Sequence, residues 1–280
     1  LSIYRYILKE MKIINHDILS KEEYCDPVKT EQNIQESLFN HLEDLPDDFN
    51  YVNIPIAQTI NKYGVPTAQR AINDIEAKYK CKKKFVCQHI LVNKLNFYNN
   101  TVFTPHAVSS DDWICIPHYN SFFNKEDAID YSTRKYKTSF IGSSSTHNIR
   151  KELFDLNNDK DIIIRDTGNW FYEKESTDRE KYSDKFKEFL LNSKLSLCPQ
   201  GTGPSTIRLY ESMAVGSMPI IFNDVKVPYG FEKHIIRLKT VNEVYDINPE
   251  TYIDQSESLH IDYWNNISNY NVYKILLNYV

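Results

Sequence analysis

The stretch Leu195–Asp224, LSLCPQGTGPSTIRLYESMAVGSMPIIFND, decides the fold that we expect for this chain. It opens with an apolar strand, LSLCP, and closes with another, MPIIFND. Between the two strands, Pro204 suits the first turn of a helix and Gly216 suits its end. Gly201, Gly203 and Gly216 are three of only seven glycines in 280 residues. A strand, a glycine-rich turn, a helix and a second strand predict one βαβ unit of a parallel sheet.

The turn after the first strand has the features of an anion site. Glycine permits positive φ and close approach of the backbone to a ligand, and the free N–H groups of a helix start favour phosphate. Arg208 and Glu211 are three residues apart and share one face of the predicted helix. The guanidinium suits a diphosphate and the carboxylate suits the hydroxyls of a ribose. An ordinary surface ion pair is the alternative interpretation. We expect Thr202 or Gly203 to be the N-cap of this helix.

A second segment, FIGSSSTHNIR, repeats the order of strand, loop and arginine-bearing helix. Hydroxyl groups, helix-start amides and one arginine again suit a phosphate. Neither loop is followed by the Gly-Lys-Ser/Thr of a kinase-type P-loop, and GTGPST lacks the third glycine of the dinucleotide pattern. The residues of the two loops and their helices that we expect to bind a nucleoside diphosphate, and hence any donor that contains one, are Gly142, Ser143, Ser144, Ser145, Arg150, Pro199, Gly201, Thr202, Gly203, Ser205, Arg208 and Glu211.

Three short apolar runs in the amino-terminal half, KFVCQHI, NTVFTPHA and DDWICIPHY, read as buried strands. Each ends near a histidine: His89, His106 or His118. Because ligands of open parallel sheets bind beyond the carboxyl ends of the strands, the three imidazoles are expected to face one crevice, although strand ends also tolerate histidine without any function. No H-x-H or H-x₃-H pair accompanies them, and the D-x-D match Asp159–Asp161 reads as a solvated turn, so no metal site is predicted.

Strands alternate with helices along the chain, which predicts an α/β fold. The polar stretch YSTRKYKTS, residues 131–139, is the predicted linker. We therefore expect an amino-terminal α/β domain over residues 1–135, a second α/β domain over 136–257 that carries both phosphate loops, and a terminal helix, 258–280, that packs back on the first domain.

Composition limits the function. The net charge is −5 and the pI is about 5.9, which argues against a general nucleic-acid binder. No apolar run approaches the ~20 residues of a membrane span, and the first residues do not form a signal peptide. Five cysteines without a C-x-x-C pair indicate free thiols in a reducing compartment. The expected protein is soluble and cytoplasmic.

The segment CPQGTGPSTIRLYESMAVGSMPIIFND resembles the signature of the exostosin-like glycosyltransferases. That signature has a Cys-Pro-x-Gly stretch, an Arg-x-x-Glu pair, an Ala-x-Gly and a Pro-led apolar strand that ends in Asn or Asp. FIGSSSTHNIR and DDWICIPHY also resemble segments of the family, although Asp112 replaces a histidine of the latter. The remaining amino-terminal half matches poorly. The short chain suggests a compact member of viral or microbial origin.

The resemblance implies a GT-B fold, in which two Rossmann-like domains face each other across a cleft. It implies an inverting transferase with a UDP-sugar bound in the C-terminal domain and an oligosaccharide or glycoprotein-glycan acceptor held mostly by the N-terminal one. Arg208, Arg150 and the amides near Thr202, Gly203 and Ser205 would neutralise the leaving diphosphate, so neither a metal nor another cofactor is expected.

Inverting transfer also needs a base for the acceptor hydroxyl. Asp74 is the first choice and His89 the second, and Asp111, Asp112 and His118 are further candidates on the acceptor side. UDP-xylose is the preferred donor because a small protein suits a pentose, while UDP-galactose, UDP-glucuronate and UDP-N-acetylglucosamine stay open. The alternatives are a fucosyl-type transferase that uses a GDP-sugar and a non-catalytic nucleotide- or carbohydrate-binding module.

Overall fold

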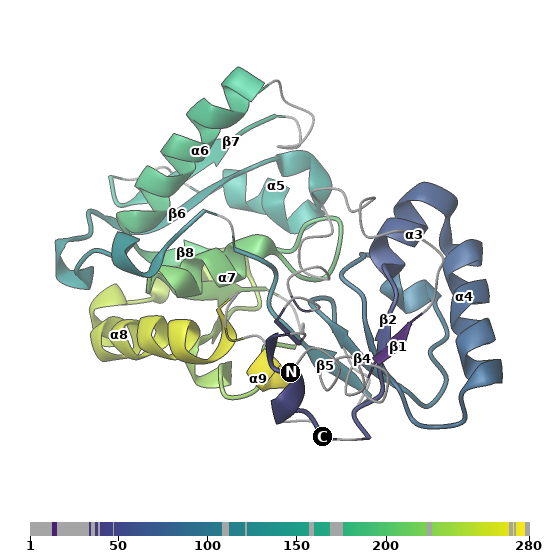
Figure 1. The fold of residues 1–280 in the computed structure, drawn as a ribbon. Coiled ribbons are helices and arrows are strands. Elements are labelled where there is room, and N and C mark those ends of the chain that lie inside the picture. Colours follow the sequence, from purple (N-terminus) through teal and green to yellow (C-terminus); the bar gives the residue numbers. More distant parts are fainter. Residues whose placement is uncertain are drawn as a thin grey trace. The chain divides into compact units, whose positions relative to one another are not determined.

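The computed structural model of the chain describes residues 13–15, 34, 37–38, 40–46, 48–107, 112–120, 122–156, 160–168, 176–222, 226–268, 271 and 273–277. The chain divides into two compact units. Unit 1 comprises residues 1–119, 225–229 and 266–280, and unit 2 comprises residues 120–224 and 230–265. Among the described residues, each unit contains a five-stranded sheet (Figure 1), and every pairing between these strands is parallel. The predicted α/β class with parallel sheets is therefore confirmed.

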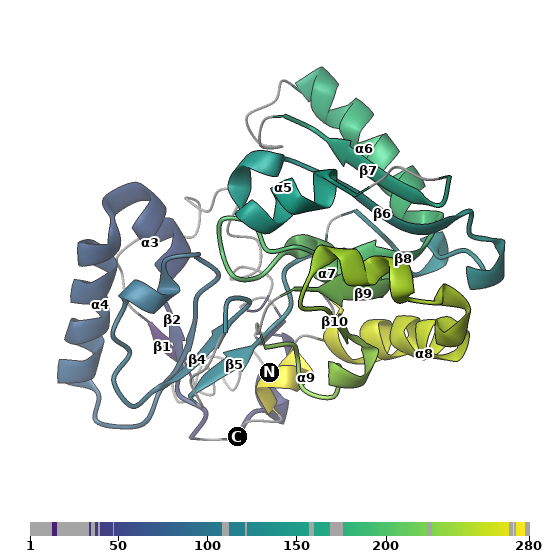
Figure 2. The ribbon, with the colours of Figure 1, turned by 180° about the vertical axis from the view of Figure 1, so that it is seen from behind.

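In unit 1 the strands cross the sheet in chain order, β1-β2-β3-β4-β5. The helices α3 and α4 lie side by side (Figures 1 and 2). The bounds are β1 Ile13–Asn15, β2 Tyr51–Asn53, α3 Ile56–Tyr63, α4 Val65–Lys78, β3 Lys84–Val86, β4 Thr101–Thr104, β5 Trp113–Cys115 and α9 Tyr273–Leu277, with short helical turns η3 Leu42–Asp44 and η4 Val92–Lys94.

Helix α4 shows why the amino-terminal sequence folds as it does. Gly64, at a φ of 83°, ends α3 and precedes α4, and Pro66 occupies the first turn, where its missing N–H costs nothing. The buried residues of α4 recur at a spacing of three or four, which makes one apolar face. That face belongs to the same core as the sheet residues Val52, Phe85 and Val102. Its members are Ala68, Ala71, Ile72 and Ile75.

In unit 2 the strand order is β10-β9-β8-β6-β7. Helices α7 and α8 contact each other, and α8 contacts β9 (Figure 2). The bounds are β6 Tyr136–Gly142, α5 Asn148–Phe154, β7 Ile162–Asp166, α6 Ser176–Leu191, β8 Ser193–Leu197, α7 Ile207–Ala214, β9 Met218–Ile221, β10 Ile236–Arg237 and α8 Ile253–Asp262. The shorter turns are η5 Lys125–Asp127, η6 Tyr131–Thr133, η7 Ser144–Thr146, η9 Glu232–His234, η10 Val241–Asp246, η11 Pro249–Tyr252 and a π-turn, Tyr263–Ile267.

The stretch 131–139, read from the sequence as a linker, belongs to unit 2. It contains η6 and the first half of β6. The Tyr131 hydroxyl donates to the Pro249 carbonyl at 2.8 Å, and the buried Arg134 donates to the carbonyls of Ser193 and Val215. These bonds attach the stretch to the sheet, so the described boundary lies at Tyr119 and Asn120 rather than at residue 135.

At the other end of unit 2, α8 begins at Ile253, before the expected terminal helix, and residues 266–280 group with unit 1. None of the helices in the described ranges is long and apolar enough to cross a bilayer. Four cysteines lie in those ranges, and three of them are buried: Cys87, Cys115 and Cys198.

Candidate functional site

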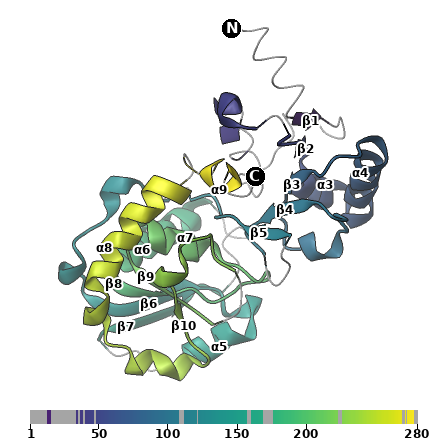
Figure 3. The same ribbon diagram turned by 90° about the horizontal axis from the view of Figure 1, so that it is seen from below.

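The order of strands in unit 2 reverses beside β6. The chain passes from β6 to β7 on one side and then returns to β8 on the other (Figure 3). In open parallel sheets, ligands bind beyond the carboxyl ends of the strands at such a switch point. Because β6 ends at Gly142 and β8 ends at Leu197, both loops predicted to bind phosphate start at this point.

The loop after β8 is longer than we predicted. Helix α7 begins at Ile207, with Thr206 as its N-cap, rather than at Pro204. The prediction of Thr202 or Gly203 as the cap is wrong, because Thr206 is extended (φ −142°, ψ 139°) and interrupts any helix that starts at the proline. The Thr206 side chain makes no capping hydrogen bond. The Ser205 hydroxyl is buried and has no partner in the described part of the chain, so donors at this helix start are available to an anion.

The far end of α7 matches the prediction. The helix ends at Ala214, and Gly216 follows with a φ of 66°. Its terminal carbonyls are bound by side chains from later in the chain. His260 Nδ1 and Trp264 Nε1 donate to the Ala214 carbonyl at 2.8 and 2.9 Å, and the Ser256 hydroxyl donates to the Gly216 carbonyl. This short helix is therefore held at its carboxyl end.

Arg208 projects from the first turn of α7 onto two aromatic rings. Its guanidinium carbon lies 4.6 Å from the centre of the Phe140 ring and 4.9 Å from that of Phe186. Its Nη2 donates to the Ile141 carbonyl. Burial lowers the pKa of Arg208, and Glu211 partly opposes that shift. A guanidinium has five N–H donors, so most of those on Arg208 have no acceptor among the described residues.

Arg150 is arranged differently, because it joins the two loops. Its Nε donates to the Gln200 carbonyl at 2.9 Å, Nη1 to Ser143 at 3.3 Å and Nη2 to Pro199 at 3.4 Å. Burial and then the charge of Arg208 lower the pKa of Arg150 to about 10. Arg150 thus holds the loop after β8 against the loop after β6. The sequence had instead predicted that Arg150 contacts phosphate directly.

The two loop glycines make room for this arrangement. A Cβ on Gly201 would lie 3.2 Å from Nη2 of Arg150, and a Cβ on Gly142 would lie 2.9 Å from Cζ of Phe140. Gly201 and Gly203 are not among the glycines with positive φ. For Gly201 the close approach of a guanidinium, rather than an unusual backbone angle, explains the absence of a side chain.

The serines predicted to bind phosphate are engaged within the loop. The Ser143 hydroxyl lies 2.7 Å from that of Ser145 and 2.6 Å from the Gly168 carbonyl. The Ser144 hydroxyl donates to Asp166 Oδ2 at 2.6 Å. Because a carboxylate beside this loop disfavours an anion, the loop after β8 is the better place for a diphosphate. Asp166 was missed in the sequence, where the end of KDIIIRD carried no sign of a contact to Ser144.

Glu211 is a buried carboxyl group, 5% exposed, on the same face of α7 as Arg208. Burial raises its pKa to about 7, and Arg208 lowers it only in part. Within the described ranges it makes neither a hydrogen bond nor an ion pair. A buried carboxylate without donors is costly, so a ligand that brings hydroxyl groups would relieve that cost.

In unit 1 the three predicted histidines follow the neighbouring strands β3, β4 and β5. The rings of His106 and His118 lie 5.2 Å apart in a T-shaped arrangement. Burial lowers the pKa of His106 to about 4 and that of His118 well below its usual value.

The third histidine, His89, accepts a hydrogen bond at Nδ1 from the Leu91 N–H, with the two nitrogens 3.0 Å apart. Its Nε2, which therefore carries the proton, donates to Asn61. Both ring nitrogens of His89 are engaged, which argues against it as the base.

Asp74 lies toward the amino ends of the strands of unit 1, whereas the three histidines follow the carboxyl ends. Helix α3 follows the carboxyl end of β2, and α4 then leads to the amino end of β3. Asp74 is exposed in the second half of α4. Its neighbour Asn73 accepts a hydrogen bond from Tyr98, just before β4. Asp112 also stands before a strand and lies 3.7 Å from Lys82. Both positions argue against these carboxylates as the base. Asp111 lies outside the described residues.

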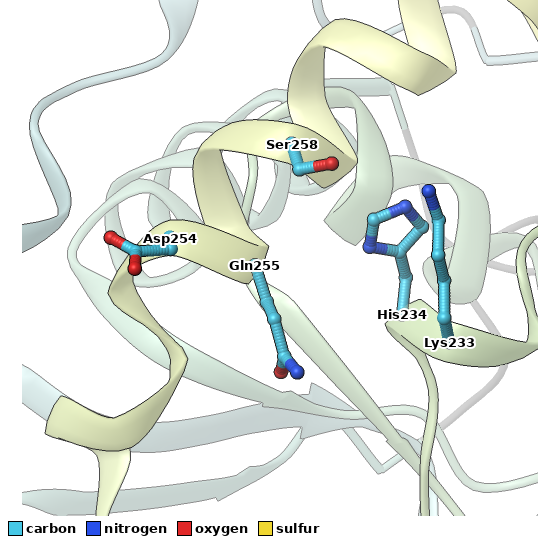
Figure 4. Close-up of a pocket in the computed structure, with 5 residues that line it drawn as sticks. All are labelled: Lys233, His234, Asp254, Gln255 and Ser258. Atoms are coloured by element: carbon cyan, nitrogen blue, oxygen red, sulfur yellow. The ribbon is translucent and has the colours of Figure 1, made fainter.

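A shallow pocket of about 180 Å³ occurs elsewhere in unit 2 (Figure 4). Because η9 directly precedes β10, the pocket lies at the amino edge of the sheet, away from the switch point. Lys233 and His234 lie side by side there, each 3.0 Å from Asp262 Oδ2. The lining residues are Lys233, His234, Asp254, Gln255 and Ser258. No predicted site residue lines it.

No three His, Cys, Asp or Glu side chains in the described ranges gather closely enough to hold a metal ion. Asp159, half of the D-x-D match, lies outside those ranges. Besides Asp166, sequence reasoning missed two aromatic residues at the switch point. Phe140 and Phe186 contact Arg208, and their spacing in the sequence carries no signal of this.

Comparison with known proteins points to the same unit. Residues 118–244 match the family described as RXYLT1 C-terminal domain. Ribitol-5-phosphate xylosyltransferase 1 of Danio rerio is 30% identical over 99 residues, which are 34% of this chain and 22% of that protein. The Mus musculus protein of the same name is 27% identical over 95 residues, or 32% and 20% of the two chains. The matched stretch thus spans about a fifth of these relatives.

The crystal structure of TarM aligns with a TM-score of 0.38 and 11% identity over 74% of this chain and 57% of that chain. The family match contains every predicted donor-binding residue. Together, the family match and the curated relatives support a glycosyltransferase.

Proposed function

We propose that this chain is an inverting glycosyltransferase of the GT-B type that moves xylose from a UDP-linked donor to a hydroxyl group of a glycan acceptor. The observation that carries the proposal is the pair Arg208 and Glu211 at the switch point of unit 2. Both are largely buried, and both keep hydrogen-bonding capacity that the described residues do not use. A nucleoside diphosphate supplies what each lacks: phosphate oxygens for the guanidinium and ribose hydroxyls for the carboxylate.

The charge of the site supports the same ligand. Arg150 and Arg208 contribute two cations, while the carboxyl group of Glu211 titrates at about pH 7. Together with the helix-start amides and the Ser205 hydroxyl, this cluster can stabilise the charge that develops on the leaving diphosphate. Side chains thereby fill the role of a divalent cation, so we propose that transfer is independent of metal.

The sugar and the acceptor are proposed from the relatives. Both curated relatives are named xylosyltransferases that act on ribitol 5-phosphate, so UDP-xylose is the first donor to test and a glycan that ends in ribitol phosphate is the first acceptor. The exostosin resemblance rests on motifs alone and agrees with a UDP-sugar. For the base we favour His118, because it follows the carboxyl end of β5, whereas Asp74 and Asp112 stand before strands of the sheet.

A thermal-shift screen tests the donor. UDP-xylose, UDP-galactose, UDP-glucuronate, UDP-N-acetylglucosamine, GDP-fucose and UDP are each added with EDTA to the wild-type chain and to Arg208→Met and Arg70→Met. Bound ligand stabilises by RT ln(1 + [L]/Kd). We expect UDP-xylose to raise the Tm of wild type and of Arg70→Met, whose arginine is exposed on α4, but not of Arg208→Met.

The outcomes separate the alternatives. Stabilisation by GDP-fucose alone would favour the fucosyl-type transferase. Stabilisation by UDP-xylose without release of UDP when acceptor is added would favour a binding module. No shift with any nucleotide sugar, with or without Mn²⁺, would refute the proposed function.

A further inference from the structure

The Phe140 ring lies under both arginines of the candidate site. It is 1% exposed and sits in the interior of β6. Its ring centre is 4.6 Å from the guanidinium carbon of Arg208 and 5.4 Å from that of Arg150. The face of an aromatic ring carries partial negative charge and attracts cations, most strongly where water is excluded. One uncharged side chain therefore contacts both cations.

The two arginines need such a support. They repel each other, since the charge of Arg208 lowers the pKa of Arg150. Neither has an ion-pair partner in the described ranges, and Arg208 makes only one hydrogen bond there, to Ile141. Apart from this bond, the aromatic contacts are what orient the Arg208 guanidinium before a ligand arrives.

The surroundings of the ring are fitted to this position. Phe154 packs against Phe140 with ring centres 6.0 Å apart, and Phe186 contacts Arg208 as well. A Cβ at residue 142 would stand 2.9 Å from Cζ of Phe140. Gly142, predicted from the sequence to admit a phosphate, instead leaves room for this ring.

From these contacts we propose that Phe140 is a positioning residue that presents Arg208, and through the shared ring Arg150, to the diphosphate of the donor. The inference rests on the proposed function and adds a residue that touches neither nucleotide nor sugar. It predicts that an apolar residue of similar size but without a π face weakens diphosphate binding through Arg208, beyond any loss of stability.

A double-mutant cycle tests the inference. UDP binding is measured by calorimetry for wild type, Phe140→Leu, Arg208→Lys and the double variant. Lysine keeps the charge but loses the planar stacking of arginine. We expect Phe140→Leu to weaken UDP binding about tenfold, which corresponds to about 1.4 kcal/mol, but less than threefold in the Arg208→Lys background, because the two residues act as one unit.

Two further variants separate positioning from folding. Phe85→Leu removes a fully buried ring from the core of unit 1 and is expected to lower the Tm without changing UDP affinity. Phe186→Leu removes the second ring over Arg208 and tests the same idea if Phe140→Leu does not fold. It should weaken UDP binding in the wild-type background but not in the Arg208→Lys background.

The cycle also distinguishes this inference from the proposed function. Unchanged UDP affinity in Phe140→Leu, or an equal loss in both backgrounds, overturns the positioning role while leaving the donor assignment intact. If wild type does not bind UDP, the cycle is repeated with inorganic pyrophosphate. If Phe140 and Arg208 are coupled in pyrophosphate binding, the positioning role of Phe140 holds, but for an anion site of another function. If wild type binds neither UDP nor pyrophosphate, both proposals are refuted.

Discussion

The two units build the same kind of sheet but wind it differently. Unit 1 adds its described strands in chain order, whereas unit 2 reverses beside β6. At the carboxyl edge of unit 1 stand imidazoles whose pKa values are lowered, so they are neutral at pH 7. At the switch point of unit 2 stand two guanidinium groups and one carboxyl group. The topology explains this difference, because only a reversal leaves two neighbouring strand ends open to a ligand.

The largest expected effect concerns the unit 1 edge. His118→Ala should lower transfer by about 10²–10⁴-fold, the usual contribution of a general base, while UDP affinity stays within about twofold. Activity is followed by UDP release in the presence of acceptor. Asp74→Ala is the matched control and should keep full activity; an inactive Asp74→Ala enzyme that still binds UDP would reverse this assignment.

The second effect contrasts the two arginines of unit 2. Arg208→Met should weaken UDP binding by about 100-fold, since charge-assisted hydrogen bonds contribute about 1.5–3 kcal/mol each, with little change in unfolding free energy. Arg150→Met should instead cost about 1–3 kcal/mol of stability, because three loop carbonyls lose their donor. Urea denaturation and calorimetry on both variants measure the contrast, and equal stability losses would show that the two arginines share one role.

The third effect is a dependence on pH at Glu211. Its folded-state pKa, about 7, lies above the ordinary 4.5, so the folded chain binds more protons than the unfolded chain between these values. Its contribution to stability is therefore present below pH 4.5 and is lost as the pH rises toward 7.

Glu211→Gln should consequently be more stable than wild type at pH 8 by roughly 2–3 kcal/mol and yet bind UDP about tenfold more weakly. UDP affinity of wild type should rise from pH 6 to pH 8, as the carboxylate forms, whereas that of the variant should stay flat. Chemical denaturation and calorimetry at both pH values measure this. Equal stability of the two proteins at pH 8 would mean that the carboxylate has a partner.

The smallest effect is steric. Gly201→Ala places a methyl group 3.2 Å from Arg150, and the end of that side chain must shift by a few tenths of an ångström. We expect a loss of about 0.5–1 kcal/mol in unfolding free energy, typical of a mild clash, and no further loss in the Arg150→Met background. If the loss is equally large in the Arg150→Met background, it comes from a backbone requirement at residue 201 and not from a clash with the Arg150 side chain.

Local features of unit 2 could be predicted from the sequence because they depend on near neighbours. Apolar runs with turns at both ends predicted β8 and β9, and Gly216 predicted the end of α7, where positive φ is required. The start of α7 could not be predicted, because Pro204 is compatible with a turn as well as with a helix. The shared face of Arg208 and Glu211 followed from their spacing alone.

Features that depend on distant residues could not be predicted. Nothing in FIGSSSTHNIR shows that Ser144 binds Asp166, or that its arginine holds the next loop rather than a ligand. YSTRKYKTS was read as a linker because it is polar and charged, yet bonds from Arg134 to Ser193 and Val215 make it part of unit 2. The edge on which Asp74 lies depends on the direction of α4 relative to the sheet, which becomes known only once the strands are paired.

The side chains that bind the end of α7 also bear on how the domain can be shortened. The family match stops at residue 244, whereas the carbonyls of Ala214 and Gly216 are bound by Ser256, His260 and Trp264. A fragment cut at the family boundary would retain Arg208 and Glu211 but would free the two-turn helix that carries them. A minimal fragment that keeps the candidate site should therefore extend through Trp264.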